Sequence, residues 1–374
     1  MKLADRVAAQ LSRRTASTAF IPEVDGLRFV AIFMVVAHHL SSYFLTYGAY
    51  ASDDAQLYHR QIFDFGSRGV DLFFTLSGFI LAVPFARQHL GGVQPQQLRW
   101  YFLRRLTRLE PPLLFHLAVL GLLRLCVTGV GGAQVATGFL GHMFYVSRVA
   151  DTYRLNVVLW SLEVEAQFYI LAPLLAMVYR LTSRSARTLV FVSIGVWLHL
   201  LAPHVFPNAD NFLTYALYFT VRMVVADCYV TSECFSAQQG QSWLDWGVVA
   251  LIPVSVLVSN REWSPELVLP LHAGLALLTA LRGGMVGRFL RNRTLVTIGG
   301  MCYTIYMYHY LMIAVVGRVT VGWFAGVPYE IFFTGQLLVH SLVIVAATAV
   351  LFRFTEKPFM AVSAKKLLAR VQRA

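Results

Sequence analysis

Ten long apolar runs dominate this chain and decide what it can fold into. The chain has 374 residues, of which 57% are hydrophobic and only 13% charged, with a mean hydropathy of +0.60. Repeated bilayer spans need such a balance, whereas a soluble domain does not. The sequence therefore predicts an all-α, polytopic membrane helix bundle of about ten transmembrane helices. The runs lie near residues 26–46, 69–86, 111–128, 162–180, 188–203, 212–231, 243–259, 266–281, 295–317 and 331–352.

The positions of the basic residues predict which side of the membrane each connecting segment faces. If the N-terminus is cytoplasmic, 22 of the 31 Lys and Arg residues fall on inside segments and 6 on outside segments. Because cytoplasmic loops carry an excess of Lys and Arg, we expect both termini in the cytoplasm. This gives a basic N-terminal segment (1–25), a transmembrane domain (26–352) and a basic tail (353–374). On a soluble surface the formal charge of +12 would suggest nucleic acid or anionic lipid as a partner, but here the positions of the charges carry the information. We expect contact with membrane lipids and no nucleic-acid partner.

The Gly-rich stretch 129–160 is the weak point of this topology. It is partly apolar but short, so both an outside re-entrant segment and an additional span remain open. If it crosses the membrane, every later segment inverts, and the Arg-rich stretches 282–294 and 353–374 face outward, against the usual bias.

The cysteines and the N-terminus add little chemistry. The four cysteines show no C-x-x-C spacing and lie in or beside apolar runs, where a small buried hydrophobe is the ordinary interpretation. We therefore expect neither a disulfide framework nor a metal site. The N-terminal segment has no long apolar core or small-residue cleavage site, and we expect it to lie uncleaved on the inner membrane surface.

The first apolar run, LRFVAIFMVVAHHL, carries ionisable residues at both ends. Arg28 and His39 are eleven positions apart, which places them on one stripe of a helix about 16 Å apart. His39 is then deep in the membrane, where an ionisable group is costly unless it faces a cavity or a partner. A proton-accepting role for His39 and a packing role in a hydrogen bond to a neighbouring helix both fit this position. We interpret His309, on an aromatic-rich helix, as a packing histidine.

A cluster of arginines occurs in LRWYFLRRLTRLEPP, ahead of a helix start that we expect at Pro111 and Pro112. Arg105 and Arg108 are three residues apart, so two guanidinium groups can converge on one polyanion, and Arg suits bidentate phosphate contacts. A cytoplasmic phosphorylated ligand would fit. A basic inside loop without a ligand explains the same charges.

The motif WSLEVEAQFY opens the fourth apolar run. Ser161 and Glu165 are four residues apart and share a helix face, whereas Glu163 lies on another face. One interpretation is a capping serine with first-turn acids. The other is a functional carboxylate that needs a partner, with His39 as the nearest candidate type.

Six motifs in order along residues 22–360 resemble the acyltransferase 3 family of membrane proteins. VDGLRFVAIFMVVAHH is similar to the family's D-G-L-R…H opening, with ten residues between Arg and His, and GVDLFFTLSGF to its second-helix motif. The later four are RRLTR, WSLEVEAQFY, CYTIYMYHY and EKPF, similar to R-x-x-R, W-S-L-x-x-E-x-Q-F-Y, S-Y-x-L-Y-x-x-H and E-R-P-F.

The resemblance implies transfer of an acyl group, acetyl first among the candidates, from cytoplasmic acyl-CoA to a hydroxyl. The implied acceptor is an envelope polysaccharide, a glycolipid or a secreted small molecule, and the implied location is the bacterial inner membrane. Acyl-CoA would be a co-substrate, with no permanently bound cofactor.

The resemblance also implies roles for individual residues. His39 would be the catalytic base, Arg28 its functional partner, and Glu165 a further member of the catalytic site. Arg105 and Arg108 would engage the coenzyme A portion of the donor, and Ser161 would bind substrate.

Two departures from the family and one alternative function accompany these expectations. Glu110, Pro111 and Pro112 replace the usual apolar or aromatic residue and single Pro after R-x-x-R, and the sequence shows no C-terminal esterase-like extension of the kind some members carry. A proton-coupled transporter or flippase using Arg28, His39 and Glu165 as a relay is the alternative. A sensor or scaffold has no cytoplasmic output domain to support it.

Overall fold

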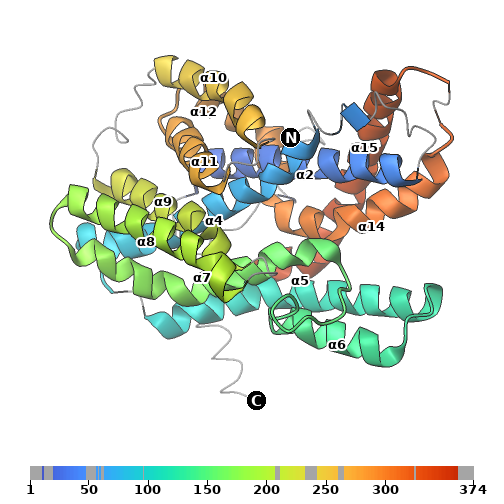
Figure 1. Ribbon diagram of the computed structural model, residues 1–374, viewed down its shortest axis with the longest axis horizontal. Helices are drawn as coiled ribbons and strands as arrows, with labels where there is room; N and C mark the ends of the chain where they lie inside the picture. The colour runs from blue at the N-terminus through green and yellow to red at the C-terminus, as the bar shows by residue number, and fades with distance from the viewer. Residues whose placement is uncertain are drawn as a thin grey trace.

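A computed structural model describes residues 20–47, 63–95, 97–206, 211–231, 242–259, 265–323 and 326–360, together with 11, 56, 57 and 59. Within these residues every regular element is a helix and no strand occurs (Figure 1). Most of the predicted terminal segments 1–25 and 353–374, and Cys234, lie outside the described residues. Cys126, Cys228 and Cys302 are thiols.

The longer helices correspond to the ten apolar runs of the sequence. They are α2 (Pro22–Tyr47), α4 (Gly69–Leu90), α5 (Leu98–Val127), α7 (Trp160–Leu175), α8 (Arg184–Val205), α9 (Phe212–Thr231), α10 (Ser242–Ser259), α11 (Pro265–Leu281), α14 (Cys302–Thr320) and α15 (Tyr329–Thr355). The shorter ones are η2 (Asp64–Arg68), α6 (Gly132–Met143), η3 (Val157–Leu159), η4 (Ala176–Arg180), α12 (Met285–Leu290), α13 (Arg293–Gly300) and α16 (Lys357–Met360).

Several of these helices are long and apolar enough to cross a bilayer. Seven helical segments of the described chain meet that criterion, and an eighth does if α13 and α14 form one bent span, whereas the apolar parts of α10 and α11 are shorter. The most apolar window, in α15, has a mean hydropathy of 2.1 but is only 22% buried. An apolar helix that leaves most of its surface outside the protein needs lipid to cover it. The chain is therefore an integral membrane protein.

Helix α2 lies at the centre of the bundle and packs against α4, α13 and α14 (Figure 1). Pro22 begins the helix, where its fixed φ suits the first turn and its missing N–H is not needed. Glu23 and Asp25 lie in that turn, where acidic side chains stabilise the positive end of the helix dipole.

Two glycines allow the start of α2 to pack against backbone. A Cβ atom at Gly26 would lie 2.1 Å from the carbonyl oxygen of Leu290 in α12, and one at Gly299 in α13 would lie 1.8 Å from the carbonyl oxygen of Asp25. Both distances are far below van der Waals contact, so only glycine permits this approach. The first turns of α2, which carry Arg28, are thereby fixed against α12 and α13.

The predicted helix start at Pro111 and Pro112 is wrong. α5 begins at Leu98 and continues through both prolines to Val127. Prolines remove backbone donors, but membrane helices tolerate them where neighbouring groups satisfy the local backbone. The hydroxyl group of Tyr303 in α14 donates a hydrogen bond to the Leu109 carbonyl oxygen in this turn, at 3.0 Å. Arg105 and Arg108 therefore lie on the same continuous helix as the apolar run.

The stretch 129–160 forms the short helix α6, which packs beside α5. Its 12 residues reach about 18 Å, whereas a bilayer core is about 30 Å thick. The chain then turns through Tyr145 and Asp151, both with positive φ, and enters α7 through η3. This length favours the interpretation in which the stretch does not span the membrane.

Helices α13 and α14 meet at a sharp break. Their axes differ by 73°, and Met301 joins them directly after Gly299 and Gly300. Because two glycines carry no side chain to support a continuous helix, the sequence is weakest at this point. The break allows α13 to pack on α2 while α14 follows its own direction through the bundle.

Candidate functional site

A pocket lies between α2, α4, α5, α7 and α14. Its empty volume is about 770 Å³ including its open mouth. Five of the six site residues predicted from the sequence line it: Arg28, Arg105, Arg108, Ser161 and Glu165. The structure thus brings together residues from three helices that the sequence could relate only by motif.

The pocket is predominantly positive because three arginines face one carboxylate. Arg28 forms an ion pair with Asp25, one turn earlier in α2, with 2.5 Å between guanidinium Nη1 and carboxylate Oδ1. The Arg105 guanidinium carbon lies 5.7 Å from the centre of the Tyr169 ring and 5.8 Å from that of Tyr101. Stacking on two aromatic faces holds this cation in place without neutralising it.

Glu165 is held on the same side of the pocket. The hydroxyl group of Tyr169, one helical turn further along α7, donates a hydrogen bond to Glu165 Oε1. Tyr169 therefore contacts both the pocket carboxylate and the Arg105 cation. The structure places Glu165 against Tyr169, so the pairing with His39 raised from the sequence is not the contact it makes.

Ser161 links α7 to α14 and does not cap its helix. Its hydroxyl donates to the Tyr306 hydroxyl oxygen at 2.8 Å, and the Tyr306 hydroxyl donates to the Val158 carbonyl oxygen at 2.8 Å. The residue that precedes α7 is Leu159, which makes no side-chain cap. The capping interpretation of Ser161 is therefore wrong, and its hydroxyl group instead bonds to Tyr306, which lines the same pocket.

His39 is not among the residues that line the pocket. Its neighbour is His309 on α14, whose Nε2 atom is 3.2 Å from His39 Nδ1. His309 Nδ1 is in turn 2.7 Å from the Tyr306 carbonyl oxygen. Tyr306 itself lines the pocket, and its ring centre lies 5.6 Å from that of His309, so the histidine pair lies close to the pocket.

These contacts define the protonation of both rings. Carbonyl oxygens only accept hydrogen bonds, so His39 Nδ1, 3.0 Å from the Val35 carbonyl oxygen, carries a proton, and so does His309 Nδ1. His309 Nε2 then presents a lone pair to His39 Nδ1–H. With its Nδ1 proton held from two sides, His39 keeps Nε2 as its basic nitrogen.

His309 is the residue that sequence reasoning assigned to packing and that the structure places in contact with His39. The two residues are separated by 270 positions, so no local spacing relates them. The signal that could have found it was the Y-x-x-H element in CYTIYMYHY, where Tyr306 and His309 stand three residues apart.

The chain matches one known protein family over most of its length. A model of the acyltransferase 3 family, described as an acyltransferase domain, matches residues 21–354. A protein of Staphylococcus aureus (strain COL) named "Putative O-acetyltransferase" is 27% identical over 188 residues, covering 47% of this chain and 28% of that protein. O-acetyltransferase OatA of Staphylococcus aureus (strain NCTC 8325 / PS 47) is 26% identical over 212 residues, covering 53% and 32%.

The matches thus extend over about a third of the length of these curated relatives. No solved structure matches the chain. The family match, by contrast, runs through all of the helices that build the pocket and the histidine pair. The chain belongs to the acyltransferase 3 family.

Proposed function

We propose that this protein transfers an acyl group, acetyl in the first instance, from acyl-CoA to a hydroxyl group of an envelope polysaccharide, a glycolipid or a secreted small molecule. The proposed location is the bacterial inner membrane. The observation that carries the proposal is the pocket, where three arginines meet one carboxylate and whose Tyr306 wall leads to the His39–His309 pair. The names of the O-acetyltransferase relatives support the acyl group.

Donor recognition is assigned to the arginines. Coenzyme A carries several phosphate charges, and a guanidinium fork binds phosphate through two parallel hydrogen bonds. Arg105 and Arg108 are one turn apart on α5, so both can reach one polyanion. Arg28 shares its charge with Asp25, which suits it to positioning rather than to binding the full phosphate charge.

The reaction proposed is direct transfer assisted by a general base. Nε2 of His39 accepts the proton of the acceptor hydroxyl as its oxygen attacks the thioester carbonyl carbon. The carbon–sulfur bond breaks, coenzyme A leaves as a thiolate, and the proton on His39 passes to that sulfur. The products are an acyl ester and coenzyme A, and His39 returns to its starting form. Glu165, held by Tyr169 inside the pocket, orients the acceptor hydroxyl.

The test measures release of coenzyme A by the purified protein in lipid nanodiscs, with acetyl-CoA and envelope glycan extracts. Arg105→Ala is compared with Arg104→Ala, because Arg104 neighbours it on α5 but does not line the pocket. Loss of a charged hydrogen-bond donor weakens binding by roughly 1.5–3 kcal/mol. We expect the KM for acetyl-CoA to rise about 10- to 100-fold in Arg105→Ala and to stay unchanged in Arg104→Ala.

The acceptor is identified by mass spectrometry of envelope glycans and secreted metabolites from cells that lack the protein, restored with wild type or with His39→Ala. Recovery of a lost acyl group by wild type alone supports the proposal, and the mass difference names the group. If wild type restores a metabolite distribution without any acyl difference and without consumption of acyl-CoA, the protein is a carrier instead.

A further inference from the structure

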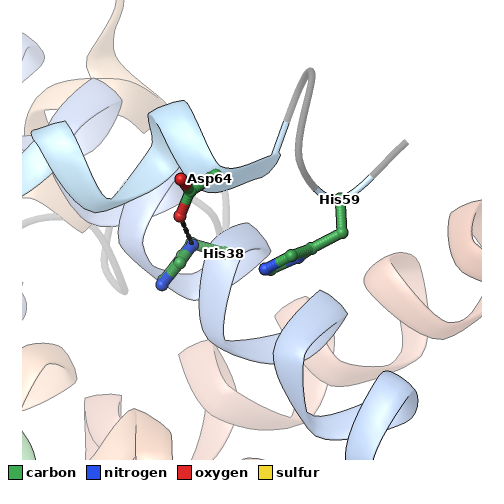
Figure 2. Close-up of side chains that lie close together, drawn as sticks. All are labelled: His38, His59 and Asp64. Atoms are coloured by element: carbon green, nitrogen blue, oxygen red, sulfur yellow. Dashed lines mark ion pairs between the residues drawn. The ribbon is translucent and has the colours of Figure 1, made fainter. Parts of the chain in front are cut away.

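Three metal-ligating side chains gather outside the pocket, beside the histidine pair. His38 in α2, Asp64 in η2 and His59 each offer a ligand atom, and these atoms lie within 4.8 Å of one another. Figure 2 shows the His59 ring directed toward His38, and Asp64 joined to His38 by the marked ion pair. His38 Nδ1 lies 3.9 Å from Asp64 Oδ1.

The ring of His59 is oriented by a contact that leaves one nitrogen for a ligand. Its Nδ1 atom is 2.9 Å from the Ser41 hydroxyl oxygen, and Ser41 is itself 3.3 Å from the Tyr329 hydroxyl oxygen. A histidine that binds a metal usually donates its second ring N–H to such a partner, which fixes the ring and its tautomer. Nε2 of His59 is therefore the nitrogen that remains for coordination.

The cluster is also accessible. The His38 side chain is 17% exposed and that of Asp64 58% exposed, so an ion can enter and the carboxylate can move. In a tetrahedral zinc site the ligand atoms lie about 3.3 Å apart, given metal–ligand bonds of about 2.0 Å. The Asp64 carboxylate needs to move inward by less than about 1 Å to reach that separation from His38 Nδ1.

One existing hydrogen bond must be exchanged. His38 Nδ1 lies 3.0 Å from the Phe63 carbonyl oxygen, which holds its proton in the metal-free protein. Coordination through Nδ1 requires the other neutral tautomer, so the ring gives up its hydrogen bond to the Phe63 carbonyl oxygen and carries its single proton on Nε2 instead. Two neutral imidazoles and one carboxylate form a set that suits zinc and related divalent transition metals.

We propose that His38, His59 and Asp64 bind one divalent transition-metal ion of the zinc class, with a water molecule completing the coordination. This site departs from the sequence expectation of no metal site, which considered cysteine spacing alone. Its ion would join α2 to the residues that precede α4. The ring centre of His38 is 5.1 Å from that of His39, so the ion would lie next to the proposed catalytic base without touching it.

The proposal is tested on the full-length protein in nanodiscs, purified with a tag that contains no histidine and stripped with EDTA. Co²⁺ is titrated and followed by its visible absorption, and Zn²⁺ is titrated by calorimetry. We expect one ion per chain and, for Co²⁺, the intense bands of a four-coordinate site. His59→Ala and Asp64→Asn each lower the affinity by more than about 100-fold, and Ser41→Ala lowers it by about 10- to 100-fold.

His89→Ala is the matched control, because His89 lies at the end of α4 beside Gln88 and outside the cluster. It leaves the affinity unchanged. Thermal unfolding with and without Zn²⁺ gives a second readout, in which the ion raises the Tm of wild type and of His89→Ala but not of Asp64→Asn. Asp64 is exposed, so its replacement retains the fold if His59→Ala does not. Binding of less than one ion per chain, or equal affinity in wild type and Asp64→Asn, would overturn the proposal.

Discussion

His309 Nε2 lies 3.2 Å from His39 Nδ1, and this contact joins α14 to α2 at the position proposed for the general base. Since the Val35 carbonyl oxygen accepts from the same nitrogen of His39, the ring is held in one tautomer and one orientation. In the proposed reaction the His39 imidazole accepts the proton, and the His309 imidazole positions it.

Replacement of His39 tests directly whether it is the general base of the proposed reaction. General-base assistance contributes about 10² to 10⁴ in rate, so His39→Ala should lose at least a hundredfold in kcat while it still inserts into the membrane. Coenzyme A release, normalised to the amount of folded protein in the membrane fraction, is the measurement. Activity equal to wild type would show that His39 only packs α2 against α14.

Replacement of His309 separates positioning from chemistry. One hydrogen bond contributes roughly 1 kcal/mol, and we expect His309→Ala to lower kcat about fivefold to tenfold and to leave the KM for acetyl-CoA unchanged. The pH dependence of kcat should shift with it, because the Nδ1 proton of His39 loses one of its two acceptors. His199→Ala, which removes a histidine bonded to the Thr214 carbonyl oxygen in a distant helix pair, should alter neither quantity.

Removal of the Tyr169 hydroxyl group tests the role proposed for Glu165, because this hydroxyl holds the Glu165 carboxylate. In Tyr169→Phe the ring still stacks on Arg105, whereas the hydrogen bond to Glu165 is lost. We expect a rise of about fivefold in the KM for the acceptor and no change in the KM for acetyl-CoA. A selective loss of donor affinity in steady-state kinetics would instead place Glu165 and Tyr169 on the donor side of the pocket.

The glycine contact at the start of α2 predicts a stability change. A side chain at Gly299 would meet the Asp25 carbonyl oxygen at 1.8 Å, and backbone cannot yield as a flexible side chain does. Gly299→Ala should destabilise the protein by about 1–3 kcal/mol and lower its Tm in nanodiscs. Gly132→Ala in α6, where a Cβ atom meets nothing within 4 Å, is the control and should leave the Tm unchanged or slightly raised.

Bilayer physics made much of the fold predictable from sequence. Each apolar run became a helix because lipid leaves backbone groups no other partner. The continuation of α5 through Pro111 and Pro112 was missed because a proline pair is a local signal for a helix start, whereas membrane helices tolerate prolines within a packed bundle. The bend between α13 and α14 was likewise missed, since it depends on how closely Gly299 can approach α2.

Most of the site residues predicted from the sequence line the pocket, but the side chains that they contact were not predicted. Motif spacing selected Arg28, Arg105 and Glu165, which the structure brings to one pocket; their roles remain predictions. Motif spacing does not show which residue each of these side chains contacts. The contact of His39 with His309 and that of Glu165 with Tyr169 depend on tertiary packing and on rotamers, and neither leaves a periodic pattern in the sequence.

The break at Met301 also has an electrostatic consequence. If α13 and α14 were one straight helix, the dipole of α14 would begin far from the pocket. Because α14 starts anew at Cys302, and Cys302 and Tyr303 line the pocket, the positive end of its backbone dipole, roughly half an elementary charge, borders the same cavity as the arginines. Part of the positive field available to the proposed anionic donor therefore comes from the main chain, and no side-chain substitution at Arg28, Arg105 or Arg108 removes it.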